Sequence, residues 1–196
     1  MNDPRPLYER AAAQFAVLLE AVTPSRLGDP TPCSEFDVRA LLSHSVNGLY
    51  LMAHIGENGD WKSAPPPVSD FADDAWRESY RDAHQRFGEA WSDDAMLSST
   101  VSSPWGEETS GHAMVGFALL ETVAHGWDLS EALGRPVELD PVLAEAVIPM
   151  AHDALPAASR GGPVPFGAVR EAPVGADAYD RLAAWLGREV PDRSHG

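Results

Sequence analysis

Three ionisable side chains in two helical segments could together hold a metal ion. Glu121 and His125 are four residues apart in AMVGFALLETVAHGWDLSEALG, so both lie on one helix face, about 5–6 Å apart at Cβ. His44 lies in a second helical segment, DVRALLSHSVNGLYLMAHIG. The carboxylate and imidazole can chelate one cation, and a histidine from a facing helix would add a third ligand. Three such ligands with a vacant position are typical of catalytic zinc.

A hydrogen-bonded pair without metal is the alternative interpretation of these residues. Glu-x-x-x-His pairs often arise by chance, and a lone histidine on an apolar face is more often a core residue. However, Glu121 interrupts the apolar run FALLETVA, and a buried carboxylate is costly unless it is paired or bound to a cation. His44 also interrupts an apolar face, so we expect it to point inward. A shared cation would explain both residues, as would a Glu121–His44 or Glu121–His125 pair.

Three further residues allow more than one interpretation. Asp128 follows His125 by three residues and could orient its ring as a hydrogen-bond acceptor, or it could face solvent near the helix end. Gly48 lies inside a helix, where glycine costs up to about 1 kcal/mol relative to alanine. It could leave room for a ligand or allow close helix packing. His84 lies beside an apolar stripe and could reach the site, although we expect it at the surface.

Hydrophobic periodicity predicts the helices that must position these residues. Apolar residues recur near a 3.6-residue period, and segments rich in glycine and proline separate the periodic stretches. Asp37, Asp140 and Asp177 are predicted N-caps, and Ser69 or Asp70 could be a fourth. The predicted helices span about residues 7–21, 38–55, 71–91, 112–133, 141–155 and 178–186.

The predicted fold is all-α, an antiparallel helical bundle with a helical C-terminal extension. The serine- and threonine-rich LSSTVSSPWGEETSG is predicted to be an extended crossover that could contain short strands beside a Pro-Trp-Gly turn. We expect residues 1–135 to form the bundle. Residues 136–196 are expected to pack on it, within a single domain overall.

Composition indicates a globular protein and argues against several classes of partner. Hydrophobic residues make up 44% of the 196 residues, and the net charge is −16 with only 14 lysines and arginines, so nucleic acid and membrane surfaces are not expected partners. One cysteine excludes an intramolecular disulfide and a cysteine-rich zinc site. No apolar run approaches a membrane span, and MNDPRPLYERAAAQF lacks a signal peptide's apolar core. We therefore expect a cytoplasmic protein, either a monomer or a homodimer.

Several motifs resemble the N-terminal domain of the mycothiol-dependent maleylpyruvate isomerase family. TPCSEFDVRALLSHSVNGL resembles that family's TPC…W-x-V-x-x-L-x-x-H opening, with Phe36 where the family usually has tryptophan. ETVAHGWDLSEALGRP resembles its E-x-x-x-H-x-W-D-L-x-x-A-x-G helix, and SSPWG resembles its crossover. FGAVREAPVGADAYDRLAAWLGRE is similar to the tail of a small actinobacterial metal-binding subfamily. The resemblance covers about residues 7–190.

This resemblance implies a DinB-like four-helix bundle with a long crossover and a divalent metal, most often zinc, with nickel as the alternative. Carried over position by position, the implied ligands are His44, Glu121 and His125. The resemblance also implies a small electrophilic substrate and a low-molecular-weight thiol such as mycothiol as co-substrate. The full-length isomerase has a C-terminal domain with a substrate-binding arginine, and no motif assigns that role to a residue here.

Three functions are consistent with these observations. The first is a metal-dependent S-transferase or isomerase that uses a thiol. The second is a metal-dependent hydrolase, which would need a separate general base, either Asp128 or His84. The third is a non-catalytic module that binds a metal or a small molecule, because a motif and a fold do not establish an activity.

Overall fold

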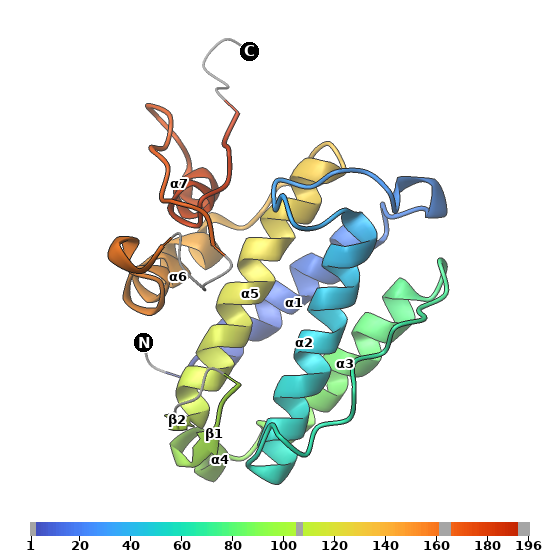
Figure 1. Ribbon diagram of the computed structural model, residues 1–196, viewed down its shortest axis with the longest axis vertical. Helices are drawn as coiled ribbons and strands as arrows, with labels where there is room; N and C mark the ends of the chain where they lie inside the picture. Colours follow the sequence, from blue (N-terminus) through green and yellow to red (C-terminus); the bar gives the residue numbers. More distant parts are fainter. Residues whose placement is uncertain (1–2, 105–107, 161–165, 192–196) are drawn as a thin grey trace.

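Four long helices form an antiparallel bundle in the computed structural model, which describes residues 3–104, 108–160 and 166–191. The predicted all-α class is therefore confirmed. Around the bundle, each helix packs against two others, in the cyclic order α1, α5, α2, α3 (Figure 1). The four helices are α1 (Arg5–Leu19), α2 (Val38–Asn58), α3 (Trp76–Ala90) and α5 (Gly111–Ala132).

Side-chain caps and glycines set the ends of the two helices that carry the candidate ligands. Asp37 caps α2, as predicted, by accepting a hydrogen bond from the backbone N–H of Ala40. The helix continues almost a full turn beyond the predicted end, because the first residue with a left-handed backbone is Gly59, at φ 72°. Ser110 caps α5, and Gly134 follows its end with φ 78°.

The start of α3 was predicted five residues too early. The helix begins after Ala75, which makes no side-chain cap hydrogen bond, so the predicted cap at Ser69 or Asp70 is wrong. Phe71 lies outside the helix and packs against Trp76, with ring centroids 5.0 Å apart. Phe71 therefore contacts the first residue of the helix from a segment whose backbone is not helical.

The crossover between α3 and α5 contains a short helix and two short paired strands. The strands that the sequence allowed are present and antiparallel, with Val101 opposite Thr109. The helix was missed because five residues are too few to show a helical period. Trp105 and Gly106 of the predicted Pro-Trp-Gly turn lie outside the described residues. The crossover elements are α4 (Asp94–Ser98), β1 (Thr100–Ser102) and β2 (Glu108–Ser110).

Two helices from the C-terminal part of the chain pack on α5: α6 (Pro141–Ala154) and α7 (Ala178–Trp185). Both start where predicted, since Asp140 and Asp177 each accept a hydrogen bond from a backbone N–H of the first turn. The indole N–H of Trp127 donates to a carboxylate oxygen at the start of α7, at 3.2 Å. The boundary between bundle and extension near residue 135 remains a prediction.

The helix α5 is the centre of the molecule. Sixteen of its 22 residues are buried, because α1 and α2 cover it from one side while α6 and α7 cover it from the other (Figure 1). Polar side chains on such a helix therefore need partners inside the protein. Within the described ranges, no helix combines the length and apolarity that crossing a bilayer would require.

Candidate metal centre

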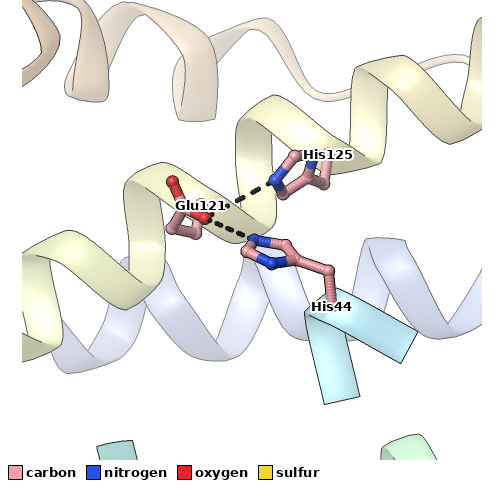
Figure 2. A group of neighbouring side chains, drawn as sticks. All are labelled: His44, Glu121 and His125. Atoms are coloured by element: carbon pink, nitrogen blue, oxygen red, sulfur yellow. Dashed lines mark hydrogen bonds and ion pairs between the residues drawn. The ribbon is translucent and has the colours of Figure 1, made fainter. Parts of the chain in front are cut away.

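The helices α2 and α5 bring His44, Glu121 and His125 together. Glu121 Oε2 lies 3.0 Å from His44 Nε2 and 3.5 Å from His125 Nε2. Figure 2 shows both imidazoles turned toward this carboxylate, one from each helix. One potential ligand atom from each residue lies within 4.8 Å of the other two. The three residues singled out in the sequence are thus neighbours in the structure, and their role as metal ligands remains a prediction.

The three side chains differ in their exposure to solvent. The side chain of His125 is 8% exposed, that of Glu121 21% and that of His44 41%. The expectation that His44 points inward therefore needs correction: its ring faces α5 but borders a cavity instead of the packed core. A cation held between these side chains would be reachable from the cavity on the His44 side.

The charges of Glu121 and His125 depend on each other. Burial alone raises the pKa of Glu121, but hydrogen bonds with His125 and His44 outweigh it and hold that pKa well below its usual value. Burial lowers the pKa of His125, but hydrogen bonds with Asp128 and Glu121 raise it to about 9. At neutral pH the metal-free cluster therefore carries a proton on His125, which a cation binding at Nε2 would have to displace.

Asp128 supports the ring of His125 from the side away from the cluster. The side chain is fully buried, so the solvent-facing interpretation of this residue is wrong. Its Oδ2 lies 3.0 Å from His125 Nδ1 and accepts the proton that this nitrogen carries. An acceptor at Nδ1 orients the imidazole and leaves Nε2 directed at Glu121.

Arg188 completes this arrangement and is the residue that sequence reasoning missed. Its Nη2 donates to Asp128 Oδ2 at 2.9 Å and its Nε donates to Oδ1 at 3.2 Å. Gly187, with φ 86°, turns the chain just before it, after the end of α7. The only signal in the sequence was an arginine directly after a glycine that ends a helix.

A cavity of about 390 Å³ lies beside the cluster. Its walls are mostly apolar and come from α1, α2, α3, α5, the segment before α2 and the C-terminal segment, which contributes Phe166 and Arg188. His84 is not among the described residues that line it. His84 lies elsewhere and is half-buried instead of fully at the surface, with its Nδ1 3.2 Å from the hydroxyl of Tyr8.

The donor set of the cluster fits a divalent cation. Two imidazole nitrogens and one carboxylate oxygen are the ligands of many catalytic zinc sites, and imidazole also suits nickel. The carboxylate would supply negative charge to offset a cation, and the buried ion pair behind His125 would hold that candidate ligand in place. The adjoining cavity would leave a coordination position open to a small molecule.

Comparison with known proteins identifies the family of this chain. The family model of the mycothiol maleylpyruvate isomerase N-terminal domain matches residues 8–130. Uncharacterized proteins from two strains of Mycobacterium tuberculosis are 33% identical to this chain over 191 residues, which cover 96% of this chain and 99% of theirs.

Solved structures share the fold at low sequence identity. A crystal structure of mycothiol-dependent maleylpyruvate isomerase gives a TM-score of 0.58 at 17% identity, covering 76% of this chain and 67% of that one. A mutant of such an isomerase gives a TM-score of 0.53 at 15% identity, covering 64% of this chain and 59% of its own. These similarities confirm the predicted DinB-like helical bundle. Because the family model covers more than half of the sequence, the chain belongs to the mycothiol maleylpyruvate isomerase N-terminal domain family.

Proposed function

We propose that this protein is a divalent-metal-dependent S-transferase or isomerase that uses a low-molecular-weight thiol of the mycothiol type on a small electrophile. The observation that carries the proposal is the convergence of His44, Glu121 and His125 at the wall of a cavity. Relatives that share the fold are named mycothiol-dependent maleylpyruvate isomerase, which supports thiol dependence. Zinc is the expected metal, with nickel as the alternative.

Different residues would bind the metal, orient its ligands and form the apolar surroundings of such a site. A bound divalent metal acts as a Lewis acid and lowers the pKa of a coordinated thiol. His44, Glu121 and His125 would hold it, while Asp128 keeps the ring of His125 oriented. The mostly apolar walls of the cavity offer few hydrogen bonds to hold water near the cluster, which would favour a thiol over water as the nucleophile.

The hydrolase alternative finds less support among the described residues. Hydrolysis would need a general base besides Glu121, which is used as a ligand. Asp128 already accepts hydrogen bonds from His125 and Arg188, and His84 pairs with Tyr8 away from the cavity. The thiol-dependent reaction needs no additional base if the metal supplies the thiolate.

Metal analysis is the first experiment. Protein purified without chelators or a histidine tag should contain about one equivalent of zinc or nickel, because the cluster forms one three-ligand site. The variants His44→Ala and His125→Ala should lose it. His54→Ala is the matched control, since His54 lies on the same helix but hydrogen-bonds Ser63 instead. Folded variants that keep the metal would rule out the assigned ligands.

Thiol consumption is the second experiment. Metal-loaded protein supplied with mycothiol and a panel of electrophiles should convert an electrophile only when thiol is present, with net loss of thiol for a transferase and without it for an isomerase, and the His44→Ala variant should do neither. Turnover without thiol would indicate hydrolysis. Stoichiometric metal without any turnover would indicate a non-catalytic binding module.

A further inference from the structure

Gly48 opens space inside the protein one helical turn after His44. A Cβ added at this position would meet no atom within 4 Å, leaving aside the helix's own nearby backbone. Close helix packing therefore does not account for the glycine. Gly48 instead lines the cavity, so the absence of a side chain enlarges the volume beside the candidate metal centre.

Beyond Gly48, towards the end of α2, apolar residues of α2 and α5 line the cavity, and this part of it is called the apolar arm here. From His44 to Ile55, α2 rises about 16 Å, and from His125 to Phe117, α5 rises about 12 Å in the opposite direction. Past the cluster, the side chains that these two helices contribute to the cavity wall are apolar. We define the apolar arm by Gly48, Leu51, Met52, Ile55, Phe117 and Ala118.

The charges that line the cavity lie at the other end. The described charged residues on its wall, apart from the histidines, are Glu35, Glu121 and Arg188. The guanidinium of Arg188 is already paired with Asp128 and donates to the carbonyl of Leu186. A carboxylate inside the apolar arm would lose its hydration without gaining a cationic partner, which is costly.

We propose that the apolar arm binds the body of the electrophile, and that this substrate is an uncharged compound with an alkyl or aromatic body of about six to ten carbon atoms. The size follows from the cavity, which is more than twice the roughly 150 Å³ that accommodates benzene. The reactive carbon would lie at the cluster, and a polar thiol would enter at the charged end. A small dicarboxylate does not fit this distribution of charge. The inference rests on the proposed function for the reaction, but occupancy of the arm can be tested independently.

A homologous series of neutral ketones tests the occupant. We would measure the binding of 2-butanone through 2-decanone calorimetrically, with metal-loaded and with metal-stripped protein, and compare maleate as a dicarboxylate. Each methylene that enters the arm should tighten binding about threefold to fourfold, until the arm is full. The trend should persist without metal, and maleate should not compete with the ketones. Affinity that is independent of chain length, or tight binding of maleate in competition with 2-octanone, would overturn the proposal.

Substitution of Gly48 shows whether the ketones lie in the apolar arm. Gly48→Leu should weaken the binding of the long ketones at least tenfold and leave 2-butanone nearly unchanged, because the new side chain occupies the arm. Gly48→Ala should also weaken the binding of the long ketones, but by a smaller factor. This variant tests the proposal if the leucine variant fails to fold. Gly88→Leu is the matched control, since Gly88 is also a helix-interior glycine with room around it, its nearest neighbour being Glu9 Oε1 at 3.8 Å.

The outcomes separate this inference from the proposed function. Unchanged metal content in Gly48→Leu would show that any loss of ketone binding arises in the arm and not at the cluster. Chain-length-dependent binding without any thiol turnover would count against the proposed function and leave the assignment of the arm standing. Ketone binding that is identical in the wild type and in Gly48→Leu would refute the assignment of the arm.

Discussion

Arg188 and Asp128 form a buried ion pair that joins the C-terminal segment to the helix carrying two of the three candidate ligands. The guanidinium makes two hydrogen bonds to the carboxylate, at 2.9 and 3.2 Å, and neither side chain is more than 7% exposed. The same carboxylate accepts the Nδ1 proton of His125. A residue 60 positions away in the sequence therefore supports a candidate metal ligand.

Arg188→Met should destabilise the protein by up to about 3–5 kcal/mol, because the buried carboxylate of Asp128 loses the guanidinium and keeps only the protonated His125 as a cationic partner. Urea unfolding of the metal-stripped protein measures the loss. Arg77→Met is the control, since Arg77 pairs with Glu20 at the surface, where such pairs contribute less than about 1 kcal/mol. Equal losses of unfolding free energy in the two variants would mean that the buried ion pair stabilises the protein no more than the surface pair does.

Asp128→Asn should weaken metal binding about 10- to 100-fold, because the amide is a poorer acceptor for His125 Nδ1 and orients the ring less well. A competitive chelator titration of the folded variant measures the affinity. Asp153→Asn, an exposed carboxylate on α6, is the control for the loss of one negative charge. An affinity equal to that of the wild type would show that Asp128 serves only the ion pair with Arg188.

The metal-free protein should lose stability as the pH rises through about 9. The pKa of His125 is raised from 6.5 to about 9 in the folded protein, so its contribution is complete below pH 6.5 and is lost as the folded form deprotonates. The loss amounts to about 3 kcal/mol, at 1.36 kcal/mol per pKa unit. Urea unfolding across this range, in the presence of a chelator, measures it.

His125→Gln provides the control for that pH dependence, because it removes the titrating group while keeping a polar side chain. Its unfolding free energy should be nearly flat over the same pH range. A slope equal to that of the wild type would assign the titration to another group. Metal binding should show the opposite trend and strengthen with pH, since the proton on His125 competes with the cation.

Two glycines on α2 should respond oppositely to alanine. Gly48→Ala should stabilise the protein by about 0.5–1 kcal/mol, because alanine is the better helix former and no atom lies near the new Cβ. Gly56→Ala should destabilise it by about 1–3 kcal/mol, because the new Cβ would lie 2.8 Å from the indole of Trp91. That indole cannot move freely, since its N–H donates to the carbonyl of Met52. Thermal unfolding compares the two, and shifts of the same sign would contradict the packing described at one of them.

The sequence by itself determined the features that depend on neighbours a few residues away. The caps at Asp37, Asp140 and Asp177 were predictable because each side chain bonds a backbone N–H within its own first turn. The juxtaposition of Glu121 and His125 was predictable because four residues make about one turn of helix. The start of α3 was not, because an apolar residue outside a helix can make the same contact as one inside it.

The tertiary structure decided which distant groups share one site. His44 meets Glu121 across 77 residues of chain, and Arg188 reaches Asp128 only because α7 packs on α5. The burial of Asp128 and the open space at Gly48 likewise depend on how the helices pack. Neither feature can be inferred from the residues nearby in the sequence. Side-chain periodicity indicates which face of a helix is apolar, whereas the distance to the opposing helix determines whether that face is filled or left as a cavity.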